Sequence, residues 1–345
     1  MKALLLIVGL CVSANTLFAT EPLKVLFIGN SFTHMNAMPK QFDKLAKSLD
    51  QKVLVEMEAK SNHTLKMHCA RPELFKTINS KKWDYVIIQP FSRELIFDKD
   101  SINEATIPYF QQIMDSIRAN NACTNILLYE TWGYKNGFAE RNDTDSFDEM
   151  AMKIENGARY IADTFDLAIV PVGMVWREIV NKHPEINLFD ADEHHPSPIG
   201  SYLVASTFYA AIYKRSFEGA PTTVYPAEQM KTIHAVTYKY VLSHIDNCDL
   251  RKNTLFITKT ESNPTTKRYK VSCKSYFKNA DSLVWDFGDK TSSKYKFTSH
   301  SYKQPGTYTI KLTVNDECGV RVYEQDVYFP APPVKKKPTS NKKKP

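Results

Sequence analysis

One serine and one Asp/His loop have residue types and spacing that suit nucleophilic chemistry. Ser31 follows closely on the apolar run KVLFIG (24–29), and the loop FDADEHHPSPIGSYLVA (189–205) carries Asp192 and His195 three positions apart. A serine hydroxyl becomes an effective nucleophile when a nearby base takes its proton and a third group orients that base. The sequence therefore predicts a relay in which Asp192 orients His195 and His195 activates Ser31.

The same loop offers a competing base, His194, with Asp190 as its possible partner. We favour His195 because the proline after it restricts its backbone to extended geometry. Ser197 is a typical N-cap and Pro198 a typical first helical residue, so this histidine stands at a rigid junction between loop and helix.

The elements that must position these residues form a strand–helix alternation from residue 23 to about 246. Expected strands are 24–29, 52–59, 84–89, 125–131 and 167–172, and expected helices are 39–49, 72–80, 104–120 and 146–165. Continuous apolar strands alternating with helices predict an α/β fold with a parallel sheet covered on both faces. Functional residues gather beyond the carboxyl ends of such strands, which is where Ser31 lies.

GNSFT (29–33) and D-x-x-H-P-S (192–197) resemble the first and last blocks of the SGNH (GDSL-like) hydrolase superfamily. The resemblance covers roughly residues 23–215 and implies a flavodoxin-like three-layer α/β/α domain, a serine esterase or acetyl hydrolase activity, and no cofactor. The nucleophile elbow of α/β-hydrolases fits less well, because position 33 is Thr rather than Gly and that fold places several strands before its serine.

The resemblance also implies oxyanion donors after the second and third strands. Asn62, in KSNHTL, stands where the superfamily usually has a glycine, and asparagine tolerates the left-handed backbone better than other non-glycine residues. Gln89, in VIIQPFS, stands where the superfamily usually has an asparagine. Ser92 is the alternative side-chain donor, with a turn-capping role also open.

Three residues after the fourth strand, Glu130, Trp132 and Tyr134, are expected on the catalytic edge, with Trp132 and Glu130 as substrate-binding residues. An aromatic ring there could stack on a sugar. An ordinary packing role for Trp132 stays equally open.

After residue 250 the pattern changes to alternation, clearest in YTIKLTV (308–314). VWDFGDKTSS (284–293) and HSYKQPGTYTIKLTV (300–314) resemble the PKD-type immunoglobulin-like module, with Lys290 where a glycine is usual. We predict an all-β sandwich over residues 251–329, which the resemblance makes a spacer or an accessory that contacts polysaccharide, protein or the cell surface.

Cysteine use gives a further expectation. Cys273 and Cys318 both fall on candidate strands of the sandwich and are the predicted disulfide. No Cys/His cluster has metal-ligand spacing, so we expect no metal site.

Residues 1–19 read as a signal peptide cleaved near Ala19–Thr20. Lipoprotein processing at Cys11 is disfavoured because Leu10 precedes it. Residues 20–250 are the expected hydrolase domain, in a secreted or periplasmic protein without a membrane span. The Pro/Lys-rich segment 330–345 is expected to be disordered and holds six lysines, so the remaining chain is close to neutral and gives no case for nucleic-acid binding.

These observations favour a secreted serine esterase that removes acyl groups from carbohydrates or glycoconjugates, with O-acetyl as the expected acyl group. The alternative is a non-catalytic glycan- or cell-surface-binding protein on an SGNH-like scaffold. Acyl transfer by the same relay also stays open.

Overall fold

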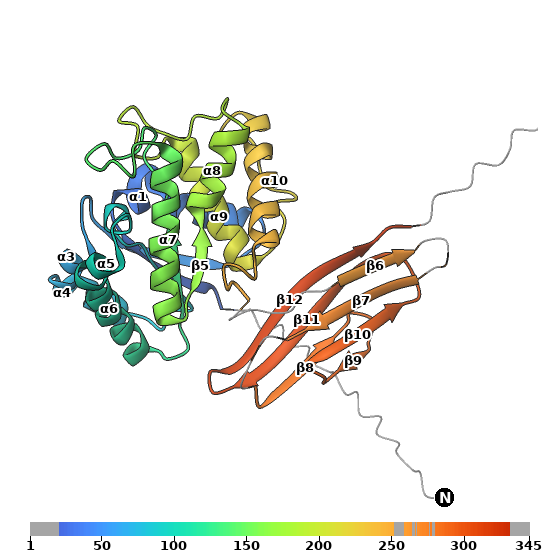
Figure 1. Ribbon diagram of the computed structural model, residues 1–345. Coiled ribbons are helices and arrows are strands. Elements are labelled where there is room, and N and C mark those ends of the chain that lie inside the picture. Colours follow the sequence, from blue (N-terminus) through green and yellow to red (C-terminus); the bar gives the residue numbers. More distant parts are fainter. Residues whose placement is uncertain are drawn as a thin grey trace, which may run out of the picture.

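The computed structural model describes residues 21–251, 259–263, 266, 268–275, 277 and 280–331. The expected signal peptide and nearly all of the expected tail lie outside these residues. Within them the chain forms an α/β domain followed by an all-β domain (Figure 1).

The α/β domain is built on one parallel sheet with strand order β2-β1-β3-β4-β5. Its strands are β1 (Leu23–Gly29), β2 (Val53–Ala59), β3 (Tyr85–Ile88), β4 (Asn125–Glu130) and β5 (Ala168–Pro171). All five predicted strands are confirmed to within two residues at each end. The carboxyl ends of β1 and β3, which are neighbours, therefore deliver Ser31 and Gln89 to the same edge of the sheet.

Helices cover both faces of this sheet (Figure 1). They are α1 (Ser31–His34), α2 (Met38–Ser48), α3 (Leu65–Cys69), α4 (Pro72–Asn79), α5 (Lys99–Ala105), α6 (Ile107–Asn120), α7 (Phe147–Phe165), α8 (Val172–Lys182), α9 (Pro198–Tyr213) and α10 (Ala227–Ser243), with 3-10 turns η1 (Met35–Ala37) and η2 (Ser92–Glu94). Successive side chains of a strand point to opposite faces, so Val25 and Phe27 join the core with α2 and α9, whereas Leu26 and Ile28 join the core with α4 and α6. The predicted three-layer α/β/α fold is confirmed.

The α9 helix begins as the sequence predicts. Pro198 is its first residue, and the Ser197 hydroxyl accepts a hydrogen bond from the Gly200 backbone N–H at 3.1 Å. Nearly every α9 side chain is buried, because the helix packs against α2, α8, α10 and β5. The loop that carries His195 is therefore anchored to one of the most buried helices of the domain.

The all-β domain pairs a three-stranded antiparallel sheet, β10-β7-β6, with a four-stranded one, β12-β11-β8-β9. The strands are β6 (Lys259–Asn263), β7 (Arg268–Lys274), β8 (Ser282–Asp286), β9 (Ser292–Ser293), β10 (Phe297–Tyr302), β11 (Gly306–Asp316) and β12 (Gly319–Phe329). Trp285 and Phe287 are buried in the core between the sheets, and Asp286 and Asp289 accept turn-forming backbone hydrogen bonds. The predicted sandwich is confirmed.

The predicted Cys273–Cys318 disulfide is wrong. Cys318, in the β11–β12 turn, is bonded to Cys123 of the turn between α6 and β4, with Cα atoms 5.6 Å apart. Cys273 is a free thiol on β7, 3% exposed among the core side chains of the sandwich. The hairpin turn faces the α/β domain rather than its own core, so the disulfide joins the two domains.

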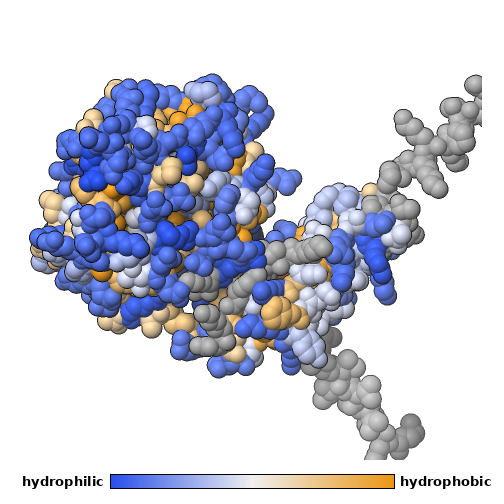
Figure 2. Space-filling model, in the orientation of Figure 1, coloured by the Kyte–Doolittle hydropathy of each residue, from blue (hydrophilic) through white to orange (hydrophobic). Residues whose placement is uncertain are grey.

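Within the described residues, none of the helices combines the length and the apolar character that a bilayer crossing requires. The visible face of the α/β domain is mainly hydrophilic, with scattered small apolar patches (Figure 2).

Candidate active site

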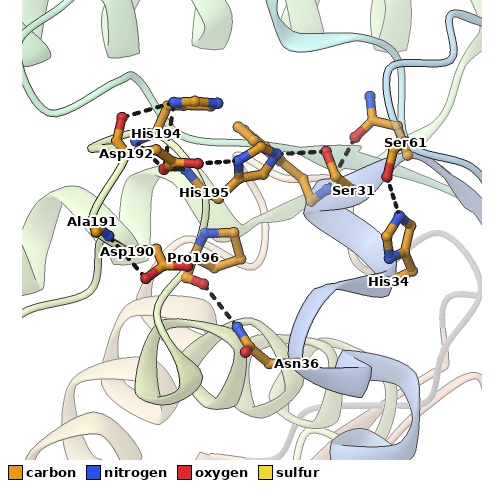
Figure 3. A network of polar contacts seen from close by, with 12 residues as sticks. Ser31, His34, Asn36, Ser61, Asp190, Ala191, Asp192, His194, His195 and Pro196 are labelled. Carbon is orange, nitrogen blue, oxygen red and sulfur yellow. Dashed lines mark hydrogen bonds and ion pairs between the residues drawn. The ribbon is translucent and has the colours of Figure 1, made fainter.

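Ser31, His195 and Asp192 lie in one hydrogen-bonded line (Figure 3). The Ser31 Oγ is 2.8 Å from His195 Nε2, and His195 Nδ1 is 2.5 Å from Asp192 Oδ2. Because the carboxylate can only accept, we assign the ring proton to Nδ1, which leaves Nε2 free to accept from the serine hydroxyl. The predicted contacts of the relay are thus present in the fold.

Asp192 is held in its role by three hydrogen bonds. Its Oδ1 accepts from the backbone N–H groups of His194 and His195, at 3.1 and 2.9 Å, while Oδ2 accepts from the His195 ring. Burial raises the Asp192 pKa, but these hydrogen bonds outweigh it and lower the pKa to about 2. The carboxylate therefore stays charged at neutral pH, as an orienting group for an imidazole must.

Of the two histidines of the loop, His195 is the one that contacts Ser31. The His194 ring contacts the Asp192 backbone carbonyl through Nδ1 at 2.9 Å and makes no contact with Ser31. The carboxylate of Asp190 accepts from the Ala191 backbone N–H instead of pairing with His194 (Figure 3).

The turn that presents Ser31 requires glycine at position 29. A Cβ there would lie 2.3 Å from Thr33 Oγ1 and 2.5 Å from Gln89 Oε1, far inside contact distance. Asn30 then caps α1 by accepting from the Phe32 backbone N–H at 3.1 Å. The sequence Gly-Asn-Ser thus makes a tight, capped turn from strand to helix with the serine at its exit.

Gln89 does not take the predicted place of an oxyanion donor. Its Nε2 donates to Asn30 Oδ1 at 2.9 Å and to the Pro90 carbonyl at 3.1 Å, while its Oε1 accepts from Asn30 N–H and the Thr33 hydroxyl. The side chain is 1% exposed and is not part of the cavity wall. The Gln89 amide points into the protein and satisfies polar groups of Asn30 and Thr33. Gln89 therefore positions the turn that carries Ser31.

Asn62 adopts a left-handed backbone, which asparagine tolerates, with φ of +56°, and it lines the cavity beside Ser31. Within the described part of the chain, neither the Ser31 nor the Asn62 backbone N–H has an acceptor. These two N–H groups are therefore available to an oxyanion formed at Ser31. Ser92, the alternative side-chain donor, also lines the cavity.

The relay opens into a cavity of about 550 Å³ at the carboxyl ends of the strands. The cavity is lined by Asn30, Ser31, Phe32, His34, Met35, Ser61, Asn62, Phe91, Ser92, Arg93, Tyr134, His194 and His195. Another hollow, of about 570 Å³, lies between the domains and contains no residue of the relay.

The predicted substrate-binding residues Trp132 and Glu130 do not line this cavity. Trp132 is fully buried and stacks between Phe32 and Trp176, with ring centroids 4.5 and 4.0 Å away. Its indole N–H donates to the His194 carbonyl at 3.1 Å, so this hydrogen bond helps to hold the loop that carries His194 and His195. Glu130 is 2% exposed and faces a separate small hollow beside α7, α8 and α10, where burial raises its pKa well above the ordinary value.

The sequence reasoning missed Phe91 and Arg93 as residues of the cavity wall, whereas Tyr134, expected on the catalytic edge, does line it. The first two follow the carboxyl end of β3, and Tyr134 follows that of β4, so their position after parallel strands was the available signal.

Among the described residues, one group of side chains has the spacing of a cation site. Ligand atoms of Asp192, His194 and His195 lie within 4.8 Å of one another. Both ring nitrogens of His195 are already hydrogen-bonded, to Asp192 and Ser31, so a cation bound there would compete with the relay.

Comparison with solved structures places the α/β domain in a known fold. A DUF4886 family protein from Bacteroides uniformis superimposes with a TM-score of 0.56 at 20% identity, covering 64% of this chain and 95% of that one. A protein assigned to the SGNH hydrolases from Slackia heliotrinireducens (24% identity, TM-score 0.43, 55% and 97% covered) and the acetyl xylan esterase AlAXEase (16%, 0.44, 55% and 100%) are more distant. The first of these superpositions shows that the α/β domain shares the fold of the DUF4886 family protein.

The all-β domain is matched by a family model. Residues 257–330 fit the description "PKD domain". The C-terminal module is a PKD domain. A 44-residue stretch of the chain is also 46% identical to the collagenase ColA of Bacillus cereus, although it spans 13% of this chain and 5% of that protein. The PKD domain is tied to the α/β domain through Cys318.

Proposed function

We propose that the protein is a serine esterase that hydrolyses acyl esters through Ser31, His195 and Asp192. The observation that carries the proposal is the unbroken Ser31–His195–Asp192 line at the wall of an open cavity. A serine hydroxyl, a base in the correct tautomer and a charged orienting group are the parts that acyl transfer to serine requires.

In this mechanism Ser31 Oγ attacks the ester carbonyl while His195 Nε2 takes its proton. The oxyanion of the tetrahedral intermediate accepts hydrogen bonds from the Ser31 and Asn62 backbone N–H groups. The protonated imidazole then gives its proton to the leaving alcohol, which leaves an acyl group on Ser31. Water, deprotonated by His195, attacks the acyl-enzyme, and the acid is released with Ser31 restored.

The finer assignment is an exported enzyme that removes O-acetyl groups from carbohydrate. Its support is the N-terminal sequence with the pattern of a signal peptide, the appended PKD domain, and a cavity with aromatic walls at Phe91 and Tyr134. The PKD domain would hold the enzyme at a polysaccharide or cell surface. Its disulfide to the α/β domain would then fix the cavity relative to that surface.

The test compares Ser31→Ala with Ser61→Ala, a change to another serine of the same cavity. We expect the wild type and Ser61→Ala to react covalently with a fluorophosphonate probe and to hydrolyse 4-nitrophenyl acetate. Ser31→Ala should lose probe labelling and at least about a thousandfold in kcat, with its melting temperature retained. A wild-type protein that neither reacts with the probe nor hydrolyses acetyl esters would instead be a binding protein on the same scaffold.

A further inference from the structure

The cavity beside Ser31 carries one cationic side chain that the proposed mechanism does not use. Arg93 lies on η2, directly after the carboxyl end of β3, and lines the same cavity as Ser31 and His195. The cavity wall contains no Asp or Glu. An arginine in such a place needs either a partner inside the protein or one brought by a ligand.

Arg93 has no carboxylate or hydrogen-bond acceptor as a partner in the part of the chain that the structure describes. Arg93 forms no ion pair there, and its Nε is buried without an acceptor. The adjacent Glu94 accepts a hydrogen bond from the Thr106 hydroxyl and makes no ion pair with Arg93. The Nη groups of Arg93 also have no acceptor among the described residues, so their N–H donors remain open to an anion in the cavity.

The guanidinium is nevertheless held in place. Its central carbon lies 5.0 Å from the ring centroid of Phe91 and 5.6 Å from that of Phe138. These cation–π contacts fix the plane of the group without using its N–H donors. Burial raises the pKa of Tyr134 in the cavity wall, and the positive charge of the neighbouring Arg93 partly offsets this by lowering the pKa.

We propose that Arg93 binds a carboxylate of the substrate, so that the enzyme prefers acetyl esters of acidic sugars such as uronates. A planar guanidinium fits a carboxylate with two parallel hydrogen bonds. The inference rests on the proposed esterase function. Because an acetyl group carries no charge, the carboxylate belongs to the alcohol part of the ester.

The experiment uses the full-length protein and two forms of one polymer: acetylated polygalacturonate, and the same polymer with its carboxylates methyl-esterified. The measured quantity is the ratio of kcat/KM for the charged form to kcat/KM for the neutral form. We expect a ratio well above one for the wild type and a fall of about tenfold to a hundredfold in Arg93→Gln. Arg93→Lys keeps the charge without the paired geometry and should fall in between. Arg177→Gln, which removes an arginine of α8 that is paired with Asp148 of α7, should keep the wild-type ratio.

Fluorophosphonate labelling of every variant keeps the outcomes distinct. A wild type that is not labelled and is inactive on both polymers overturns the esterase itself. A labelled wild type with equal rates on both forms, or an Arg93→Gln variant that is labelled with an unchanged ratio, overturns the role of Arg93 alone. In competition against 4-nitrophenyl acetate hydrolysis, galacturonate should inhibit more strongly than galactose. Stronger inhibition by galactose 6-sulfate than by galacturonate would exclude the carboxylate.

Discussion

The Ser31 Oγ lies 2.8 Å from His195 Nε2 although 164 positions separate the two residues. The contact arises because β1 ends at the same sheet edge that the loop before α9 crosses, and both segments are fixed by helix caps. A serine and a histidine from opposite ends of the domain thereby form one hydrogen-bonded pair.

The orienting carboxylate gives the first prediction. In Asp192→Asn the amide keeps the shape of the side chain but removes the negative charge that fixes the His195 tautomer. We expect kcat for acetyl ester hydrolysis to fall by about 10³–10⁴ with little change in melting temperature. His194→Gln is the matched control and should cost far less, because His194 does not contact Ser31. Equal losses in the two variants would contradict the assignment.

The left-handed backbone of Asn62 gives the second prediction. Asn62→Gly preserves access to φ of +56°, whereas Asn62→Val disfavours it strongly, because β-branched residues rarely adopt that region. We expect kcat to be close to wild type in the glycine variant and about a hundredfold lower in the valine variant. A valine variant with full activity would show that this N–H does not hold the oxyanion.

The inward amide of Gln89 gives the third prediction. Gln89→Leu leaves the Asn30 N–H and the Thr33 hydroxyl without their acceptor, which should lower the free energy of unfolding by about 2–4 kcal/mol. Denaturant unfolding measures this loss, and Gln111→Leu on the exposed face of α6 should stay near wild type. If Gln89 were instead an oxyanion donor, kcat would fall while stability stayed unchanged.

Glu94 gives a pH-dependent prediction. Burial raises its pKa to about 7, although the hydrogen bond from Thr106 works in the opposite direction. A carboxyl whose pKa is raised by folding binds its proton more tightly in the folded state. Its contribution to stability is therefore complete below its ordinary pKa of 4.5 and is lost as the pH rises toward 7.

Glu94→Gln removes this titration. The unfolding free energy of the variant minus that of the wild type should increase between pH 4.5 and pH 7 and level off above, by at most about 3 kcal/mol. Denaturant unfolding at several pH values tests this expectation, with the exposed Glu104→Gln as control. A difference that is independent of pH would show that the Glu94 carboxyl titrates normally.

The disulfide between the domains gives the last prediction. Peptide mapping without reduction should yield a cross-linked pair that contains Cys123 and Cys318, and Cys273 should react with alkylating reagents after unfolding but not before. Cys318→Ser should lower the melting temperature, because the bond closes a loop of 195 residues and such a closure stabilises by a few kcal/mol. A cross-linked Cys273–Cys318 peptide would contradict the structure.

The sequence by itself determined the five strands, the α9 cap and the three residues of the relay. These features depend on local chemistry: continuous apolar runs form buried strands, serine and proline start helices, and a serine after a strand meets other strand ends at one sheet edge. The left-handed backbone of Asn62 agrees with the tolerance of asparagine for that conformation, which is a property of a single residue type.

Only the tertiary structure decided where Gln89, Trp132 and Cys318 point. Each lies near a strand end or turn, where a small rotation directs the side chain either outward or into the protein, and the partner that settles the choice is distant in sequence. Gln89 points inward because it accepts the hydrogen bond of the Asn30 backbone N–H. Trp132 is enclosed by the rings of Phe32 and Trp176. Cys318 is bonded to Cys123 of the neighbouring domain. Such choices follow from packing and hydrogen-bond satisfaction across the whole fold, which local patterns do not encode.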